Sequence, residues 1–187
     1  MDTFSKLSKQ KIGIEKDTYT YEGEYLKIKE REGREFVVEP DSVIAIPHLI
    51  DYDEILVRKE YVPAFHEKHP ENEFFLTMIS GTIEDGETPV DTLIRELQEE
   101  AGVLLNTTYM NYERWGEFFT NKGNSSKFHI FYIPLKINDF QKIKAMGDGS
   151  KFEDMSKTAR INTKYLESLK GSDLVTAYCL EKLKGKL

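Results

Sequence analysis

The chain has 187 residues, of which 39% are hydrophobic and 32% charged, and its formal net charge is -7. This length and composition predict a globular protein with one well-buried core. They exclude a membrane-spanning helix, because no apolar run approaches roughly 18 residues, and the acidic balance argues against binding a nucleic-acid backbone.

The opening segment and the cysteine content both bear on location. Residues 1–11 are polar and lack the apolar stretch of a secretory signal. Cys179 is the single cysteine, so neither an intramolecular disulfide nor a thiolate metal cage can form. We expect Cys179 to be a small core residue and the protein to be cytoplasmic.

Residues from about 11 to 40 are rich in β-forming side chains, and Gly23 and the pair Glu32-Gly33 interrupt them. This pattern predicts a small antiparallel sheet. We therefore predict an N-terminal β subdomain over residues 1–40 and a main domain over residues 41–187.

The main domain begins with strands and then a helix. Strands are predicted over residues 42–46, 54–61 and 74–79, and the first two are joined from Pro47 through a turn at residues 51–53. A helix is predicted over residues 88–101. Its boundaries are well marked, because Thr88 can cap it, Pro89 suits its first turn and Gly102 can end it.

Two further strands are predicted over residues 113–119 and 127–134, separated by an exposed loop at residues 121–126. Residues 139–159 show no clear pattern. The chain then has an amphipathic pattern over residues 172–184, which predicts a helix capped by Ser172.

The helix over residues 88–101 carries acidic side chains on one face. Glu96, Glu99 and Glu100 stand at positions i, i+3 and i+4, so their carboxylates project from the same side. The opposite flank is apolar and suits packing on a sheet; it consists of Val90, Leu93, Ile94, Leu97 and Ala101.

Like charges at this spacing repel one another, so something must offset the repulsion. A hard divalent cation such as magnesium takes carboxylate oxygens together with substrate phosphates and water. The alternative interpretation is an acidic face that is simply solvated.

Residues 81–103 read Gly-x5-Glu-x7-Arg-Glu-Leu-x-Glu-Glu-x-Gly-Val. This segment matches the Nudix box at every defined position, and the chain therefore resembles the Nudix hydrolases. The resemblance implies the Nudix fold, an α/β protein (an α+β sandwich) with a mixed β-sheet between helices, over residues 41–187. It also implies hydrolysis of a nucleoside diphosphate linked to another moiety.

The resemblance implies roles within the box. The principal metal ligands, for Mg²⁺ or alternatively Mn²⁺, would be Glu96, Glu99, Glu100 and the backbone carbonyl of Ser80. Glu87 and Arg95 would support them, because an arginine can hold a carboxylate in a bidentate pair and fix the loop against the helix. Gly81 and Gly86 would permit the tight loop that leads to the helix.

Outside the box, the chain looks like the branch of pyrophosphatases that act on ADP-ribose and nucleoside diphosphate sugars. Relatives of this kind are commonly homodimers in which the N-terminal sheet helps to form the partner's site. By analogy, Tyr21 or Phe36 could stack on the base and Arg58 could contact a phosphate. The alternative for each aromatic residue is a place in the core or an interface.

Two departures from the branch concern the substrate, since Val62 replaces the usual arginine and no proline occurs over residues 117–120. Related enzymes often take a general base from a loop after the later strands. Glu153 is the best match, followed by Asp154, and each could instead be a solvating acid.

Alternative substrates are GDP-sugars, dinucleoside polyphosphates and capped RNA, and the acidic charge disfavours RNA. A catalytically silent nucleotide-sensing module is a further alternative, although the box retains all its acids. Trp115 could line the pocket or belong to the core.

Overall fold

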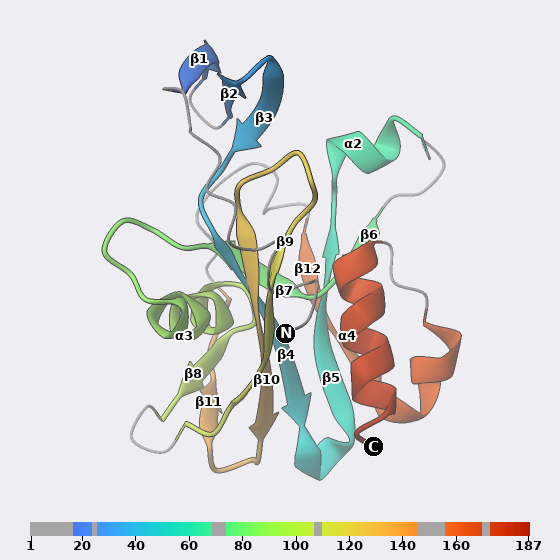
Figure 1. The fold of residues 1–187 in the computed structure, drawn as a ribbon. Helices are drawn as coiled ribbons and strands as arrows, with labels where there is room; N and C mark the ends of the chain where they lie inside the picture. Colours follow the sequence, from blue (N-terminus) through green and yellow to red (C-terminus); the bar gives the residue numbers. More distant parts are fainter. Residues whose placement is uncertain (1–16, 24–25, 69–73, 107–109, 146–155, 170–172) are drawn as a thin grey trace, which may run out of the picture. The chain divides into compact units, whose positions relative to one another are not determined.

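The computed structural model describes residues 17–23, 26–68, 74–106, 110–145, 156–169 and 173–187, and Figure 1 shows its course. The chain divides into two compact units. One comprises Met1–Glu39 and Phe119–Ser126, and the other comprises Pro40–Phe118 and Lys127–Leu187.

The smaller unit contains a three-stranded antiparallel sheet. Its strands are β1 (Thr18–Glu22), β2 (Lys27–Arg31) and β3 (Arg34–Val38). The loop over residues 119–126 joins this unit through Val37, whose N–H donates to the Gly123 carbonyl at 2.7 Å and whose carbonyl accepts from the Ser125 N–H at 2.9 Å. The predicted small antiparallel sheet is confirmed.

The larger unit is built on a mixed seven-stranded sheet. Its strands are β4 (Ser42–Leu49), β5 (Glu54–Glu60), β6 (Phe75–Thr77), β7 (Ile79–Thr82), β9 (Glu113–Phe119), β10 (Lys127–Leu135) and β12 (Lys157–Asn162). The order is β12-β5-β4-β10-β9, with β6 paired to β5 and β7 paired to β4. Strands β4 and β10 run parallel, and β4 pairs antiparallel with both β5 and β7.

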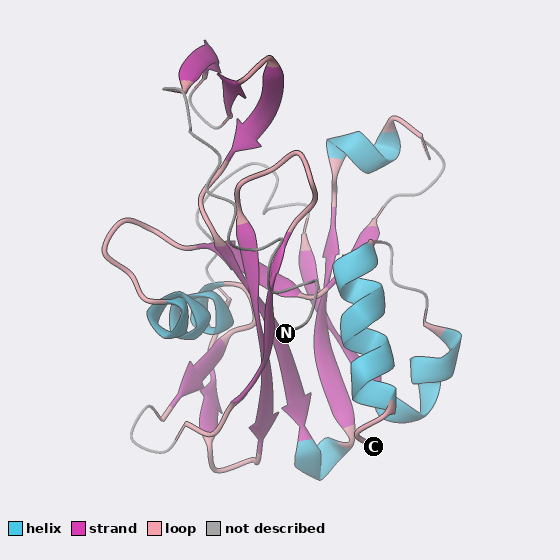
Figure 2. Cartoon of the chain, in the orientation of Figure 1, coloured by secondary structure: helices cyan, strands magenta, loops and turns pink. Residues whose placement is uncertain are grey.

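The remaining elements surround this sheet (Figure 2). They are the helices α2 (Pro63–His66), α3 (Pro89–Glu99) and α4 (Leu174–Lys184), the 3-10 turns η1 (Ile50–Tyr52) and η4 (Thr163–Ser168), and the paired strands β8 (Val103–Leu105) and β11 (Phe140–Lys142). No helix in the described ranges is long and apolar enough to cross a membrane.

Helices α3 and α4 cover opposite faces of the sheet, as Figure 1 shows. Successive residues of β4 supply the two cores, because side chains alternate along a strand. Val43 packs in the cluster beneath α3, whereas Ile44 packs in the cluster beneath α4. The predicted α/β fold, with a mixed sheet between helices, is confirmed.

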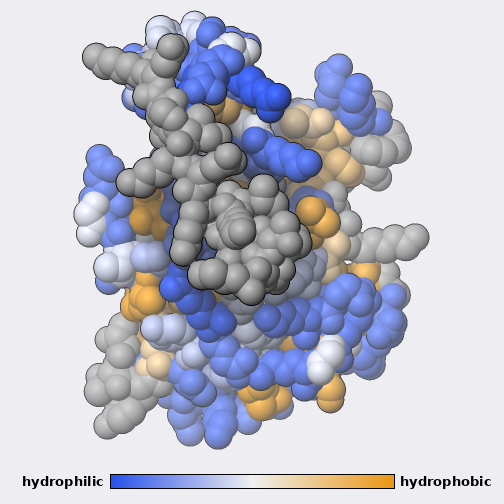
Figure 3. All heavy atoms as spheres, viewed as in Figure 1, coloured by the Kyte–Doolittle hydropathy of each residue, from blue (hydrophilic) through white to orange (hydrophobic). Residues whose placement is uncertain are grey.

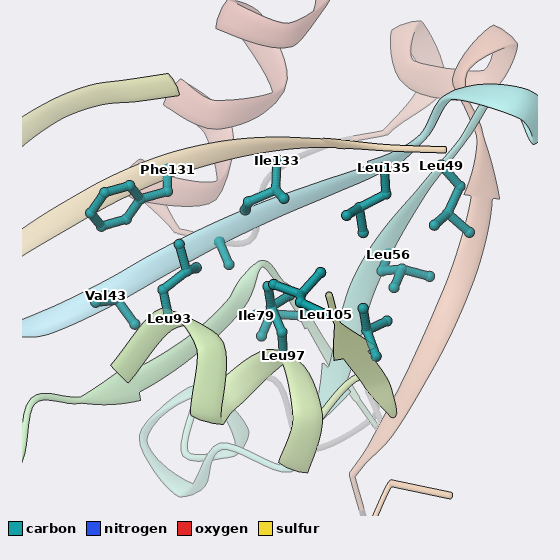
Figure 4. Packing of buried hydrophobic residues seen from close by; sticks show 12 residues of the cluster. Val43, Leu49, Leu56, Ile79, Leu93, Leu97, Leu105, Phe131, Ile133 and Leu135 are labelled. Carbon is teal, nitrogen blue, oxygen red and sulfur yellow. The ribbon is translucent and has the colours of Figure 1, made fainter. Parts of the chain in front are cut away.

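Helix α3 begins where its sequence signals predict and ends at Glu99, two residues before the predicted end. The Thr88 hydroxyl accepts from the Asp91 N–H at 3.2 Å, and the Asp91 carboxylate accepts from the Thr88 N–H at 2.9 Å, which forms a capping box. Leu93 and Leu97 are fully buried against β4, β7 and β10 (Figure 4). Burial of each such leucine contributes about 1.5–3 kcal/mol, so this face anchors the helix.

Two predicted strands differ in extent from those observed. Strand β4 continues past Ile46 to Leu49, and Pro47 lies within it. It pairs with β7 over Ser42–Ala45 and with β5 only from His48, so Pro47 stands where the partner on that side changes and a missing N–H is tolerated. The strand predicted over residues 74–79 is two short strands, β6 and β7, separated at Met78.

The last helix also begins differently. Asp173 caps α4, because its carboxylate accepts from the Thr176 N–H at 2.8 Å, whereas the predicted cap, Ser172, lies outside the described residues. Leu174 is 83% exposed and therefore does not belong to the apolar face. Residues 139–159, which showed no clear pattern, contain β11 and the start of β12.

The core predictions for two residues are confirmed. Cys179 is fully buried, and this burial raises the pKa of its thiol to about 12. Trp115 is buried and stacks on Tyr132, with ring centroids 5.0 Å apart and planes 3° from parallel.

On the face shown in Figure 3, hydrophilic residues predominate and apolar ones are scattered.

His48 is an imidazole held in the core at the end of β4. Its Nδ1 lies 2.8 Å from the Tyr132 hydroxyl, and its buried Nε2 has no hydrogen-bond partner within the described part. Burial lowers the pKa of His48, with a smaller contribution from Lys186, while Asp53 opposes the change from 4.0 Å. Folding therefore favours the neutral form of the ring.

We expect the free energy of unfolding to fall as the pH falls through about 6.5, because the unfolded chain then binds a proton that the folded His48 does not. Urea unfolding between pH 5.5 and 7.5 measures this. His48→Gln should flatten that part of the profile, whereas His66→Gln on α2 should leave it in place. A wild-type profile that is already flat, or an unchanged slope in His48→Gln, contradicts the assignment.

Candidate active site

The segment between β7 and α3 is fixed by the carboxylate of Glu87. This side chain accepts from the Glu84 N–H at 3.1 Å and from the Thr92 hydroxyl at 2.7 Å. Gly86 has φ +90°, a conformation that a residue with a side chain rarely adopts. Glu87 therefore ties the loop between β7 and α3 to the first turn of α3.

Arg95 links this loop to the acidic face of α3. Its Nε and Nη2 lie 2.9 and 3.1 Å from the two oxygens of Glu87, which is the bidentate pair that the Nudix resemblance implied. Its Nη1 donates to Glu96 at 2.7 Å and to Glu99 at 3.1 Å, and its Nη2 donates to the Thr82 carbonyl at 2.9 Å. The Arg95 hydrogen bonds lower the pKa of Glu87 to about 2, so this carboxylate stays ionised.

Glu96 occupies the space that a side chain at residue 81 would need. It is 7% exposed, and a Cβ added to Gly81 would lie 1.8 Å from its Oε1. Gly81 itself is in β7, opposite Val43, and not in the tight loop that we expected. The physical reason for glycine here is the close approach of Glu96 and not a turn.

Glu100 stands at the C-terminal cap of α3 and is 9% exposed. Its Oε1 lies 3.1 Å from Nη2 of Arg58, and its buried Oε2 has no hydrogen-bond partner among the described residues. Burial raises the pKa of Glu100 to about 8, although Arg58 opposes the rise. Thr158 on β12 holds the Glu100 carbonyl with a hydrogen bond of 2.6 Å.

The structure thus brings Glu87, Arg95 and the three acids of α3 together, and it adds Arg58. This arginine, for which we predicted a phosphate contact, is itself buried and also lies 3.5 Å from Glu60. Ser80, the predicted carbonyl ligand, is in β7 next to Gly81.

The other predicted site residues belong to the smaller unit or fall outside the described residues. Tyr21 is in β1 of the smaller unit and is 53% exposed. Phe36 is in β3 of the same unit and is half-buried, with the Arg31 guanidinium 5.5 Å from its ring centre. Glu153 and Asp154, the predicted general bases, lie outside the described residues.

A surface pocket of about 390 Å³ opens beside Glu100. The described residues that line it are Ser42, Ile44, Glu60, Thr77, Met78, Ser80, Gly81, Thr82, Glu100, Phe128, Asp173, Val175 and Thr176. Sequence reasoning missed Glu60, Thr77 and the first turn of α4, because they reach this pocket from distant parts of the chain. Strand alternation did offer one signal, since it places Arg58 and Glu60 on the same face of β5.

The acidic side chains fit a hard divalent cation by their chemistry. Glu96, Glu99 and Glu100 present only oxygen ligands, and the unpartnered Oε2 of Glu100 is available to a cation. As the described side chains lie, no three acids or histidines are arranged to hold a metal ion. Arg95 engages Glu96 and Glu99 instead, so these carboxylates must turn from the arginine to share a cation.

Comparison with known proteins agrees with this geometry. The NUDIX domain, as a family, matches residues 39–160. A protein named ADP-ribose pyrophosphatase from Bacillus subtilis (strain 168) is 25% identical over 153 residues, which cover 82% of this chain and 77% of the relative. The chain belongs to the Nudix family. It is a Nudix pyrophosphohydrolase similar to the ADP-ribose branch, as the box and the flanking residues indicated.

We expect Gly81→Ala to lower turnover by on the order of 100-fold, because a methyl group there displaces the Glu96 carboxylate by an ångström or more. Steady-state kinetics at matched folded fractions measures the loss. Gly185→Ala is the matched control, since the nearest heavy atom to its added Cβ is 3.6 Å away. Wild-type turnover in Gly81→Ala would show that the Glu96 position does not matter.

Proposed function

We propose that this protein hydrolyses the pyrophosphate bond of a nucleoside diphosphate sugar, with ADP-ribose as the first candidate, in a magnesium-dependent reaction. Water adds across one P–O–P bond and gives a nucleoside monophosphate and a sugar phosphate. The observation that carries the proposal is the buried, unpartnered Glu100 oxygen beside Glu96 and Glu99 at the edge of an open pocket. The relative named ADP-ribose pyrophosphatase supports the choice of substrate.

Glu96, Glu99, Glu100 and the Ser80 carbonyl would hold the metal. When bound, Mg²⁺ or Mn²⁺ would neutralise the diphosphate, lower the pKa of a water molecule and stabilise charge on the leaving phosphate. Glu153, or Asp154 after it, is our proposed general base.

Two arginines would position these groups. Arg95 fixes Glu87 and the loop against α3, and it holds Glu96 and Glu99 near one another before a cation competes for them. Arg58 orients the buried carboxylate of Glu100, and its charge would also attract a substrate phosphate. We propose both as positioning residues.

We also propose that residues 1–40 form a subdomain through which two chains make a homodimer. An exposed aromatic residue such as Tyr21, or the half-buried Phe36, would then stack on the base of the substrate. The use of a single cysteine, Cys179, which is buried, supports a cytoplasmic setting.

A substrate panel with product identification tests the function. The panel contains ADP-ribose, ADP-glucose, GDP-mannose and a dinucleoside polyphosphate, each with Mg²⁺, with Mn²⁺ and with EDTA. We expect AMP and ribose 5-phosphate from ADP-ribose, and we expect EDTA to abolish turnover. Preference for the GDP-sugar or the dinucleoside polyphosphate would replace ADP-ribose as the substrate, and tight binding without any turnover would favour a nucleotide-sensing module.

Glu100→Gln should lower turnover by orders of magnitude while the protein remains folded. Glutamine keeps the size of the side chain and an oxygen that can accept from Arg58, but it is a poor ligand for a hard cation. Glu181→Gln, an exposed position on α4, is the control that should keep full activity. Retention of more than about half of the activity in Glu100→Gln would contradict its role.

A further inference from the structure

The pocket beside Glu100 lies where two short strands separate. Strand β6 pairs with β5 and strand β7 pairs with β4, so the sheet divides on either side of Met78. The first turn of α4 stands next to β6 (Figure 1), and the Thr176 hydroxyl lies 3.4 Å from the Thr77 hydroxyl. Glu100, Ser80 and Gly81 line the same pocket, which makes it continuous with the catalytic acids.

Hydroxyl and carboxylate groups dominate the polar part of the pocket. Its hydroxyl groups come from Ser42, Thr77, Ser80, Thr82 and Thr176, and its carboxylates from Glu60, Glu100 and Asp173. No lysine or arginine occurs among the described lining residues. Arg58 pairs with Glu60 and Glu100, so the lining presents hydroxyl donors and carboxylate acceptors without an excess of positive charge, and a neutral group with many hydroxyls would find partners for both kinds of hydrogen bond.

Two of the polar side chains that line the pocket, Asp173 and Thr176, are already fixed by hydrogen bonds. The Asp173 carboxylate accepts from the Thr176 hydroxyl at 2.7 Å and also from the Thr176 N–H, the bond that caps α4. These two hydrogen bonds hold both side chains in place. Because the Thr176 proton is engaged by Asp173, the Thr77 hydroxyl, 3.4 Å from the Thr176 oxygen, can donate its own proton to a ligand oxygen and can accept a proton from a ligand hydroxyl. Glu100, whose buried and unpartnered Oε2 we assign to the cation, marks the end of the pocket at which the diphosphate would lie.

The size of the pocket and its few aromatic residues favour a sugar over a nucleobase. Its volume of about 390 Å³ is enough for a pentose or hexose. Phe128 is the single aromatic residue in the described lining, whereas bases are usually held by stacking on aromatic side chains. The floor of apolar residues, Ile44, Met78 and Val175, suits the carbon face of a sugar ring.

We propose that this pocket receives the uncharged sugar that is linked to the diphosphate, and that Thr77 and Ser42 are specificity-determining residues which hydrogen-bond its hydroxyls. The inference rests on the proposed function, because the diphosphate must lie at the acids of α3 for the attached sugar to enter. The nucleoside then lies outside this pocket.

Isothermal titration calorimetry with two non-hydrolysable probes tests the proposal. The α,β-methylene analogue of ADP-ribose carries the terminal sugar, and α,β-methylene ADP lacks it. In the presence of Mg²⁺, Thr77→Val should weaken binding of the first probe by about 3- to 10-fold, as expected for one lost hydrogen bond, and leave the second unchanged. Ser42→Ala, which removes a hydroxyl from a different strand, should show the same selectivity.

Thr163→Val is the matched control, because it removes a hydroxyl of the same unit that does not line the pocket, and both affinities should match those of the wild type. Unchanged affinity for the ADP-ribose analogue in both pocket variants overturns the assignment. Equal weakening of the two probes also overturns it, since the pocket would then hold the nucleotide.

Failure of the proposed function gives a different result. A wild-type protein that neither binds the ADP-ribose analogue nor hydrolyses a nucleotide sugar overturns both proposals. The pocket assignment alone is overturned if the wild-type protein binds the ADP-ribose analogue and hydrolyses a nucleotide sugar while the pocket variants behave like the control.

Discussion

Electrostatic repulsion among the acids of α3 is the constraint on which the rest of this structure depends. Glu96, Glu99 and Glu100 share one helical face, and such crowding disfavours a helix in isolation. Two arginines offset it from opposite directions, Arg95 on the loop side and Arg58 from β5. Burial of the apolar flank then holds the acids at the sheet, where a shared cation would complete the compensation.

Local signals in the sequence predict much of this arrangement. Helix α3 begins after Thr88 because a capping box and a proline mark its start, and its core face follows from the spacing of Leu93 and Leu97. The bidentate contact between Arg95 and Glu87 lies within one motif, and the resemblance of that motif to the Nudix box implied it.

Features that depend on contacts between distant parts of the chain could not be predicted from these local sequence signals. The contact of Arg58 with Glu100 joins a strand to a helix end, and the pocket draws on five strands and the ends of two helices. Gly81 looked like a loop residue, yet it is required because a distant side chain lies over it. Pro47 looked like the end of a strand, since a change of strand partner leaves no mark in a single sequence.

The parallel pairing of β4 with β10 has a consequence for how the chain folds. The two strands meet across a wide interval, as in the 2.9 Å bond from the Lys127 N–H to Asp41, which spans 86 residues. Closing so long a loop costs entropy before the contacts that reward it can form, and non-local pairing of this kind slows folding. Helix α3, with its three acids, lies inside that loop. During synthesis, the sheet that supports this helix is therefore incomplete until β10 has emerged and docked, so the site is completed late.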